Sequence, residues 1–292
     1  GNTPANTGQF GVSVIGEGAV CDINGGKIEA GWFAVAGSGN PGKGGTTINI
    51  NEGANLHSAA DYAIYHPQEG VLNINGGKIY GEAGGIDMND GVLNVTGGDI
   101  FSNGQGNTGN WGDGTGKLGR AAVYFSAKYG DVTATISGGS LAAADGAVMI
   151  DEQGKKFDVS CVITGGTFSH DPSNYVASGQ TAVKGADDKY SIVKSVAKAG
   201  DKEYATIAAA IEDATDVIVL LSDTTEDVTI PAGKEVTLDL AGHQLTNVSG
   251  HTITNNGTLT ITGNGTVDNV THQKAALYNA VECTATIENG TL

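Results

Sequence analysis

One pattern of apolar and polar positions recurs along the chain: alternating apolar residues, a polar-glycine turn, and another apolar residue. It reads INGGKI at 74–79 and VTGGDI at 95–100. Neighbouring copies lie 21 to 27 residues apart, except at two gaps of 41 and 98 residues. A repeat of this length is typical of one solenoid turn with three short strands. The apolar residues before the turns are Ile23, Ile50, Ile74, Val95, Ile136, Ile163, Ile261 and Ile287.

Alternation within each copy separates an inside from an outside, because successive side chains of a strand point to opposite faces. Ile74 is then internal and Asn73 external. Stacking the coils aligns the residues before the turns in one internal ladder. A second internal ladder follows the turns and contains Ile28, Ile79, Ile100, Leu141 and Phe168. The chain is therefore predicted to be all-β, a right-handed parallel β-helix.

Corners and further strands complete each predicted coil. The glycines of Asn75-Gly76-Gly77 are expected to adopt positive φ, which glycine tolerates. A further apolar strand follows each turn, at Trp32–Ala36, Tyr62–Tyr65, Ile86–Met88, Val123–Phe125 and Val148–Ile150.

The two gaps divide the chain. The shorter gap contains the Gly- and Asn-rich run 102–120, which is expected to be a loop. The longer gap predicts a boundary, with coils and a closing block over 1–198 and a second β-helix unit over 199–292. This second unit opens with an amphipathic helical pattern at 204–214, in which Ile207 and Ile211 share one face. We expect this short helix to cap the coils that follow.

Composition narrows the function classes. The chain has 47 Gly among 292 residues, and its 32 acidic and 15 basic residues give a net charge of −17. Such a surface repels phosphate backbones, so no nucleic-acid partner is expected. No apolar run approaches the roughly 20 residues that cross a bilayer, so no membrane insertion is expected. Cys21, Cys161 and Cys283 have the parity of inward residues and are predicted to be buried free thiols.

Carboxylates around the further strands are the candidate chemistry. Asp87, Asp90, Asp151 and Glu152 are expected to share one face, together with Asp145. Paired carboxylates can serve as acid and base or bind Ca²⁺ through oxygen ligands. The alternative is a solvated acidic face, and no cofactor other than Ca²⁺ is suggested.

Aromatic residues gather in the first 130 positions. Trp32, Tyr65, Trp111 and Tyr124 are candidates for stacking on sugar rings, as aromatic faces on a flat surface do. The alternative is stacking between adjacent coils, which stabilises any solenoid.

Two segments resemble blocks of repetitive β-helix surface proteins of Gram-positive gut anaerobes. ITGGTFSHDPSNYVASGQTAVKGADDKYSIV at 163–193 is similar to their coil-ending block, and YATIAAAIEDATDVIVLLSDTTEDVTIPAGKEVTLDLAGHQLTN at 204–247 is similar to their opening block. The resemblance implies a secreted, adhesin-like protein of the bacterial cell surface, and it supplies no catalytic residues.

These observations favour a non-catalytic, extracellular structural or adhesive rod with host or environmental glycans as ligands. A carbohydrate-active enzyme or glycan-binding module of the pectate-lyase-like type stays the alternative, and an antibody-binding surface protein is a third interpretation. Coils and a closing block precede a cap and further coils, an order that suits one period of a tandem array. That order predicts head-to-tail self-association into a fibre or filament.

Overall fold

The computed structural model describes residues 9–102, 120–213 and 217–292. The chain is a parallel β-solenoid of about ten turns with one short helix, which confirms the predicted fold class. It forms two compact units, residues 1–177 with 182–192, and residues 178–181 with 193–292. The predicted insertion lies outside the described residues except at its ends.

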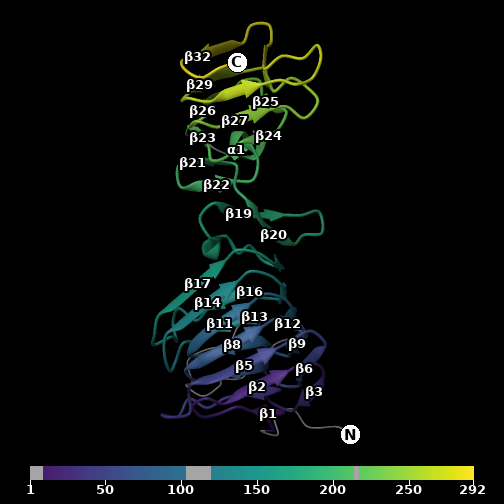
Figure 1. Ribbon diagram of the computed structural model, residues 1–292, viewed down its shortest axis with the longest axis vertical. Helices are drawn as coiled ribbons and strands as arrows, with labels where there is room; N and C mark the ends of the chain where they lie inside the picture. The colour runs from purple at the N-terminus through teal and green to yellow at the C-terminus, as the bar shows by residue number, and fades with distance from the viewer. Residues whose placement is uncertain (1–8, 103–119, 214–216) are drawn as a thin grey trace. The chain divides into compact units, whose positions relative to one another are not determined.

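Three sheets build the first unit, and successive coils add strands to sheets B, C and A in turn (Figure 1). Sheet A contains β1 (Val12–Ser13), β4 (Val35–Ala36), β7 (Tyr62–His66), β10 (Gly84–Met88), β13 (Ala121–Phe125) and β16 (Gly146–Ile150). Sheet B contains β2 (Val20–Ile23), β5 (Thr46–Ile50), β8 (Gly70–Ile74), β11 (Gly91–Val95), β14 (Val132–Ile136) and β17 (Val159–Ile163). Sheet C contains β3 (Gly26–Ala30), β6 (Ala54–Ser58), β9 (Lys78–Gly81), β12 (Asp99–Ser102), β15 (Ser140–Ala142), β18 (Thr167–Phe168), β20 (Tyr190–Lys194) and β19 (Gln180–Lys184).

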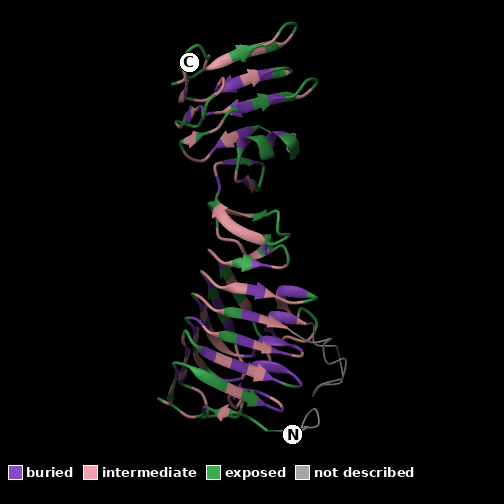
Figure 2. Cartoon of the chain, turned by 90° about the vertical axis from the view of Figure 1, so that its right-hand side faces the viewer, coloured by how far each residue is buried: buried purple, intermediate pink, exposed green. Residues whose placement is uncertain are grey.

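Both predicted internal ladders of the first unit are present. In sheet B, Ile50, Ile74 and Val95 are paired in register and fully buried. In sheet C, Leu56 supplies the rung between Ile28 and Ile79, at a copy whose turn is less regular. The inward residues of the stacked coils form one continuous core, visible as the buried stripes of Figure 2. Each fully buried Ile or Leu contributes about 1.5–3 kcal/mol, so the stack is stable only as an array.

The outer face of sheet B carries a ladder of amides. Asn49 donates from Nδ2 to Asp22 Oδ1 (2.6 Å), Asn73 donates to Asn49 Oδ1 (2.8 Å), and Asn94 donates to Asn73 Oδ1 (2.9 Å). An amide has both donors and an acceptor, so identical side chains in register satisfy one another. This asparagine ladder joins the coils from outside, as the apolar ladders do from inside.

Only one glycine of each corner pair has the predicted positive φ. Positive φ occurs at the second glycine, +84° at Gly26 and +85° at Gly77, and not at Gly76. A Cβ added to Gly76 would instead lie 2.9 Å from the backbone of Glu52 in the adjacent coil. Gly76 is therefore required for close approach between coils, whereas Gly77 is required both for the turn and for close approach, since a Cβ there would lie 2.9 Å from the carbonyl oxygen of Ala54.

The closing block ends the parallel stacking of sheet C. Strand β20 pairs antiparallel with β18, and Tyr190 and Ile192 pack against the core. The block also includes a 3₁₀ turn, η1 (Ser173–Tyr175). The boundary predicted between 198 and 199 falls inside β21 (Ala197–Ala199), which pairs with strands of the second unit, so that unit begins a few residues earlier.

The second unit also has three sheets, with shorter strands. Sheet D contains β22 (Lys202–Tyr204), β21, β23 (Ile218–Leu220), β26 (Glu235–Asp239), β29 (Thr258–Thr262) and β32 (Thr284–Ile287). Sheet E contains β24 (Thr224–Thr225), β27 (Gln244–Thr246) and β30 (Thr266–Asp268), and sheet F contains β25 (Val228–Ile230), β28 (Ile253–Asn255) and β31 (Leu277–Asn279).

The internal ladder of sheet D explains the long gap in the repeat. Ile218 pairs with Leu238, Leu238 with Ile261, and Ile261 with Ile287. Ile218 and Leu238 are thus rungs without a Gly-Gly turn: after Leu238 the chain turns through positive φ at Ala241 and Gly242. The periodic spacing continues where the motif does not.

The capping helix is shorter than predicted. Helix α1 covers Ile207–Asp213, while Tyr204 ends β22. Thr206 Oγ1 accepts from Ala209 N–H (3.0 Å), which fixes the helix start. Ile207, Ala210 and Ile211 are buried in the core of the second unit, so the helix does cover apolar coil residues as expected.

All three cysteines are free thiols, as predicted, but each is only partly buried. Cys21 and Cys161 border the core of the first unit, and burial raises the pKa of the Cys161 thiol to about 12. Cys283 precedes β32, is also partly buried, and has Sγ 3.6 Å from the carbonyl oxygen of Val281. Its inward parity agrees with the prediction, because Cys283 and Ala285 are partly buried whereas Thr284 and Thr286 are exposed.

Candidate functional site

The predicted aromatic residues gather at sheet A. Tyr65, Asp87 and Tyr124 are paired in register on consecutive strands, and Trp32 precedes β4. The fourth predicted residue, Trp111, lies outside the described residues. The register therefore brings two of the predicted ring residues and one predicted carboxylate into a single row.

Most of these rings contact other parts of the protein. Phe33 stacks on Trp32 and on Tyr65, with centroids 4.8 Å apart in both pairs, and Tyr62 lies 6.0 Å from Tyr124. Trp32 and Tyr65 are half-buried, and Tyr124 is buried. The Phe33–Tyr65 pair is stacking between adjacent coils, the alternative to sugar binding, whereas Trp32 and Phe33 are neighbours in the chain and Tyr62 and Tyr124 lie two coils apart.

Two carboxylates are buried beside the rings. Asp87 is only 7% exposed and accepts a hydrogen bond from Ser126 Oγ (2.5 Å); burial raises its pKa to about 7. Asp61 accepts from Trp32 Nε1 (2.9 Å) and from the N–H of Tyr62 (2.8 Å), and burial raises its pKa as well. Asp61 was not a predicted site residue, since its sequence context resembles that of any turn aspartate.

The other predicted carboxylates lie in turns that join sheet A to sheet B. Asp151 accepts from the N–H of Gly154 (2.9 Å), and Glu152 pairs with Lys155 (2.7 Å). Asp87 aligns with Met149 two coils away, so Asp151 is not beside it. The part of the chain that the structure describes contains no group of three or more His, Cys, Asp or Glu residues that could hold a metal ion. The four residues predicted to share a Ca²⁺ site are not brought together.

A cavity of about 450 Å³ opens at this same edge of the first unit. Its walls are the equivalent A-to-B turns of five successive coils, which place Glu17, residues 38–42 and 44–45, residues 67–69, Asp90 and Tyr129 around one space. We call this space the A–B cavity. Of its residues only Asp90 was a predicted site residue. The sequence signal was an acidic residue recurring in these turns, but which turns meet depends on their lengths.

Buried polar contacts hold the A–B cavity in shape. Gln68 is 2% exposed; it donates from Nε2 to the carbonyl of Val14 (3.0 Å) and to Thr46 Oγ1 (2.9 Å), while its Oε1 accepts from the N–H of Ser38 (2.5 Å). One side chain thereby fixes three turns. Tyr129 is 49% exposed, and a side-chain hydrogen bond joins it to Tyr65.

The charge of the A–B cavity has one sign. Glu17, Glu69 and Asp90 contribute carboxylates, and no Lys, Arg or His is among the described lining residues. Burial raises the pKa of Asp90, and repulsion from Glu69 and Asp131 raises it further. Such a cavity favours an uncharged or cationic ligand over an anionic one.

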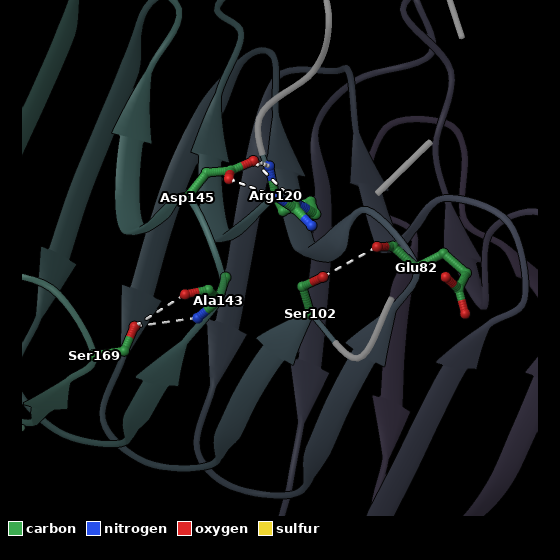
Figure 3. A network of polar contacts seen from close by, with 6 residues as sticks. All are labelled: Glu82, Ser102, Arg120, Ala143, Asp145 and Ser169. Atoms are coloured by element: carbon green, nitrogen blue, oxygen red, sulfur yellow. Dashed lines mark hydrogen bonds and ion pairs between the residues drawn. The ribbon is translucent and has the colours of Figure 1, made fainter. Parts of the chain in front are cut away.

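Hydrogen bonds at the opposite edge, where sheet C meets sheet A, are structural (Figure 3). Arg120 donates hydrogen bonds from Nε (3.1 Å) and Nη2 (2.9 Å) to the Asp145 carboxylate. This ion pair lowers the pKa of the Asp145 carboxyl. Ser102 Oγ donates to the carbonyl of Glu82 (3.0 Å), and the N–H of Ala143 donates to Ser169 Oγ (3.2 Å). The candidate carboxylate Asp145 therefore ties neighbouring coils together.

The fold and the cavity define the class of the protein, a parallel β-solenoid whose first unit carries an acidic cavity with an aromatic side chain, Tyr129, in its wall. The chain matches no protein-family model, no curated protein sequence and no solved structure. Within the described residues, no helix combines the length and apolar character that crossing a bilayer requires.

Proposed function

We propose that the chain is a non-catalytic, extracellular adhesive protein of a bacterial surface, whose coils carry the A–B cavity as a glycan-binding site. The observation that carries the proposal is the combination of the exposed Tyr129 ring with three carboxylates and the side-chain amide of Asn40, while the buried Gln68 holds the walls. Aromatic faces pack on the C–H face of a sugar ring. Carboxylates accept hydrogen bonds from its hydroxyls, and an amide can both donate and accept them.

The size and charge of the A–B cavity limit which class of glycan it can bind. A volume of about 450 Å³ lies within the range of small-ligand sites and suits one or two sugar residues. The three carboxylates favour neutral or amino sugars and disfavour polyuronates and sialic acids. The proposal thus differs in ligand charge from the pectate-lyase-like alternative.

A glycan array tests the proposal, with neutral, amino-sugar, uronic-acid and sialylated glycans. Tyr129→Ala is expected to weaken binding of neutral or amino-sugar glycans at least tenfold. Tyr278→Ala is the matched control, because Tyr278 is 47% exposed and lies in the second unit. Binding confined to uronic acids, or equal binding by both variants, would contradict the proposal.

A second candidate function, a polysaccharide-acting enzyme, is favoured by one observation. A carboxyl whose pKa burial raises to about 7 has the property that a general acid needs. Asp87 is nevertheless buried, bonded to Ser126, and not among the residues that line the A–B cavity. Turnover of plant or host polysaccharides that is lost in Asp87→Asn would favour the enzyme over the adhesive protein.

The proposal includes head-to-tail self-association of two copies. Its support is Ile287, which is 49% exposed although its ladder partner Ile261 is fully buried. An apolar rung from a second copy would bury it, as each coil buries the next. Sedimentation velocity at increasing concentration is expected to show larger species that Ile287→Lys abolishes; a concentration-independent monomer would contradict this part.

A further inference from the structure

A row of stacked rings runs along the outer face of sheet C. His57, Tyr80 and Phe101 are paired in register, each directly after an internal ladder residue. The centroids of His57 and Tyr80 lie 4.5 Å apart, and those of Tyr80 and Phe101 lie 4.9 Å apart with ring planes within 2° of parallel. The spacing equals the distance between strands, so the coils themselves set the stack.

The row stops at Phe101. The next residue in register is Ala142, which offers a methyl group where each of the three preceding coils offers a ring. A cavity of about 370 Å³ lies there, lined by Phe101, Ala142 and a polar rim of Asp99, Ser102, Ser140, Ser169 and Lys189. We call this space the Phe101 notch.

The free face of Phe101 is not occupied by the neighbouring cation. Lys78 Nζ lies 5.1 Å from the Tyr80 centroid and 5.2 Å from the Phe101 centroid. Because these distances are nearly equal, the ammonium group sits beside the two ring edges at a level between them. Lys78 therefore does not cover the side of Phe101 that faces Ala142, where the described residues leave a cavity.

Hydrogen bonds hold the walls of the Phe101 notch in place. Ser102 Oγ donates to the carbonyl of Glu82 (Figure 3). Ser169 Oγ accepts from the N–H of Ala143 and also lies 2.9 Å from Nδ1 of His170 and 3.4 Å from the carbonyl oxygen of Ala143. A hydroxyl oxygen has two lone pairs, so Ser102 and Ser169 each keep one acceptor site for a ligand. The site is thus preformed, which lowers the entropic cost of binding.

We propose that the Phe101 notch binds a neutral pyranose residue, which takes the place of the missing ring. The apolar C–H face of the sugar stacks on Phe101, and its hydroxyls bond to Ser102, Ser140 and Ser169. The three serine hydroxyls favour a polyhydroxylated ring over an aromatic side chain of a protein partner. Asp99 and Lys189 carry opposite charges, so the rim prefers no net charge. This site lies on a different sheet from the A–B cavity and does not depend on it.

The test measures binding of cellotriose and maltotriose by calorimetry and by ligand-observed NMR. Ala142→Phe fills the notch with the missing ring and is expected to weaken binding at least tenfold. Phe101→Leu is expected to weaken it similarly, and Phe101→Tyr to preserve it. Thr135→Phe is the matched control, since Thr135 is an exposed residue on the outer face of sheet B. Thermal melts establish that each variant is folded.

All four notch and control changes are also made in the Tyr129→Ala background, which separates the two sites. Binding that survives Tyr129→Ala and is lost in Ala142→Phe supports the Phe101 notch and counts against the A–B cavity. Binding lost in Tyr129→Ala but unchanged in Ala142→Phe overturns the notch and leaves the proposed function intact. Binding of N-acetyltyrosine amide in place of both sugars, or of neither probe class, also overturns the notch.

Discussion

Sheets A and B of the first unit share one coil spacing yet have different outer faces. In sheet B, burial alternates along β14, with Thr133 and Thr135 exposed between buried residues. In sheet A, all five residues of β10 and of β13 are buried. The outside of sheet B is a surface of paired amides, whereas the outside of sheet A holds buried rings and the carboxyl of Asp87. Regular alternation, as in sheet B, stabilises the fold. Departures from it, as in sheet A, bury polar and aromatic side chains on the outer face and so create candidate sites.

The largest expected effect comes from putting a charge inside the regular sheet. Ile74→Asp places a carboxylate in a fully buried ladder without any partner, so we expect at least about 4 kcal/mol of destabilisation. Asn73→Asp, one residue away, keeps its side chain outside and is expected to cost only about 1 kcal/mol. Thermal melts of both variants compare the two faces directly, and equal losses would contradict the inward assignment.

The second effect tests the corner glycines. Gly26 and Gly77 have the same φ, but a Cβ at Gly26 meets nothing within 4 Å, whereas one at Gly77 lies 2.9 Å from the carbonyl oxygen of Ala54. Gly26→Ala is expected to cost about 1 kcal/mol for left-handed φ alone. Gly77→Ala adds a steric conflict and is expected to cost about 3 kcal/mol. Denaturant unfolding measures both, and similar values would mean that the coils separate easily at this corner.

These two predictions also show which features the sequence determines. The ladders follow from a period of two within strands and 21 to 27 between them, and both are visible in the letters. Gly76 and Gly77 look alike in sequence, because the letters show neither the positive φ that only Gly77 has nor the close approach of both to the adjacent coil. Ile218 and Leu238 were missed as rungs, since their turns use other residues.

The sites were less predictable for a related reason. Trp32, Tyr65 and Asp87 were chosen for their chemistry, and the register does bring Tyr65 and Asp87 together. Their burial depends on departures from alternation in sheet A. The A–B cavity depends on the lengths of five turns. The Phe101 notch depends on a small residue, Ala142, at an outward strand position where no sequence motif marks a site.

A third effect, at sheet A, depends on pH. The unfolded Asp87 carboxyl ionises near pH 4, but burial raises its folded pKa to about 7. Between these values the folded state holds a proton that the unfolded state releases, so this contribution to stability falls as pH rises and is fully lost above pH 7. Asp87→Asn is expected to stabilise the protein by about 2 kcal/mol at pH 8 and by nothing at pH 4.

The free energy of unfolding must be compared between variant and wild type at each pH, because the titration of His66 changes stability with pH in the opposite direction to that of Asp87. Burial lowers the pKa of the His66 imidazole to about 4, so its contribution is lost as pH falls below about 6.5. The two slopes offset each other in the wild type. Denaturant melts at pH 4 and 8 decide the matter, with the exposed Asp201→Asn as control. A pH-independent difference would mean that the pKa of Asp87 is not raised.

The smallest effect tests whether the asparagine ladder of sheet B stabilises the coils. Asn73 donates to Asn49 and accepts from Asn94, so Asn73→Ala removes two hydrogen bonds and leaves an unpaired group on each neighbour. At this half-exposed position water replaces part of the loss, and we expect a cost of about 1 kcal/mol. Thr135→Ala is the control, because Thr135 continues the same outer row beyond Asn94. Urea unfolding measures the free energy of unfolding of both variants. Equal losses would mean that the hydrogen bonds between the amides are no stronger than their hydrogen bonds to water, and that the internal apolar ladder alone stabilises sheet B.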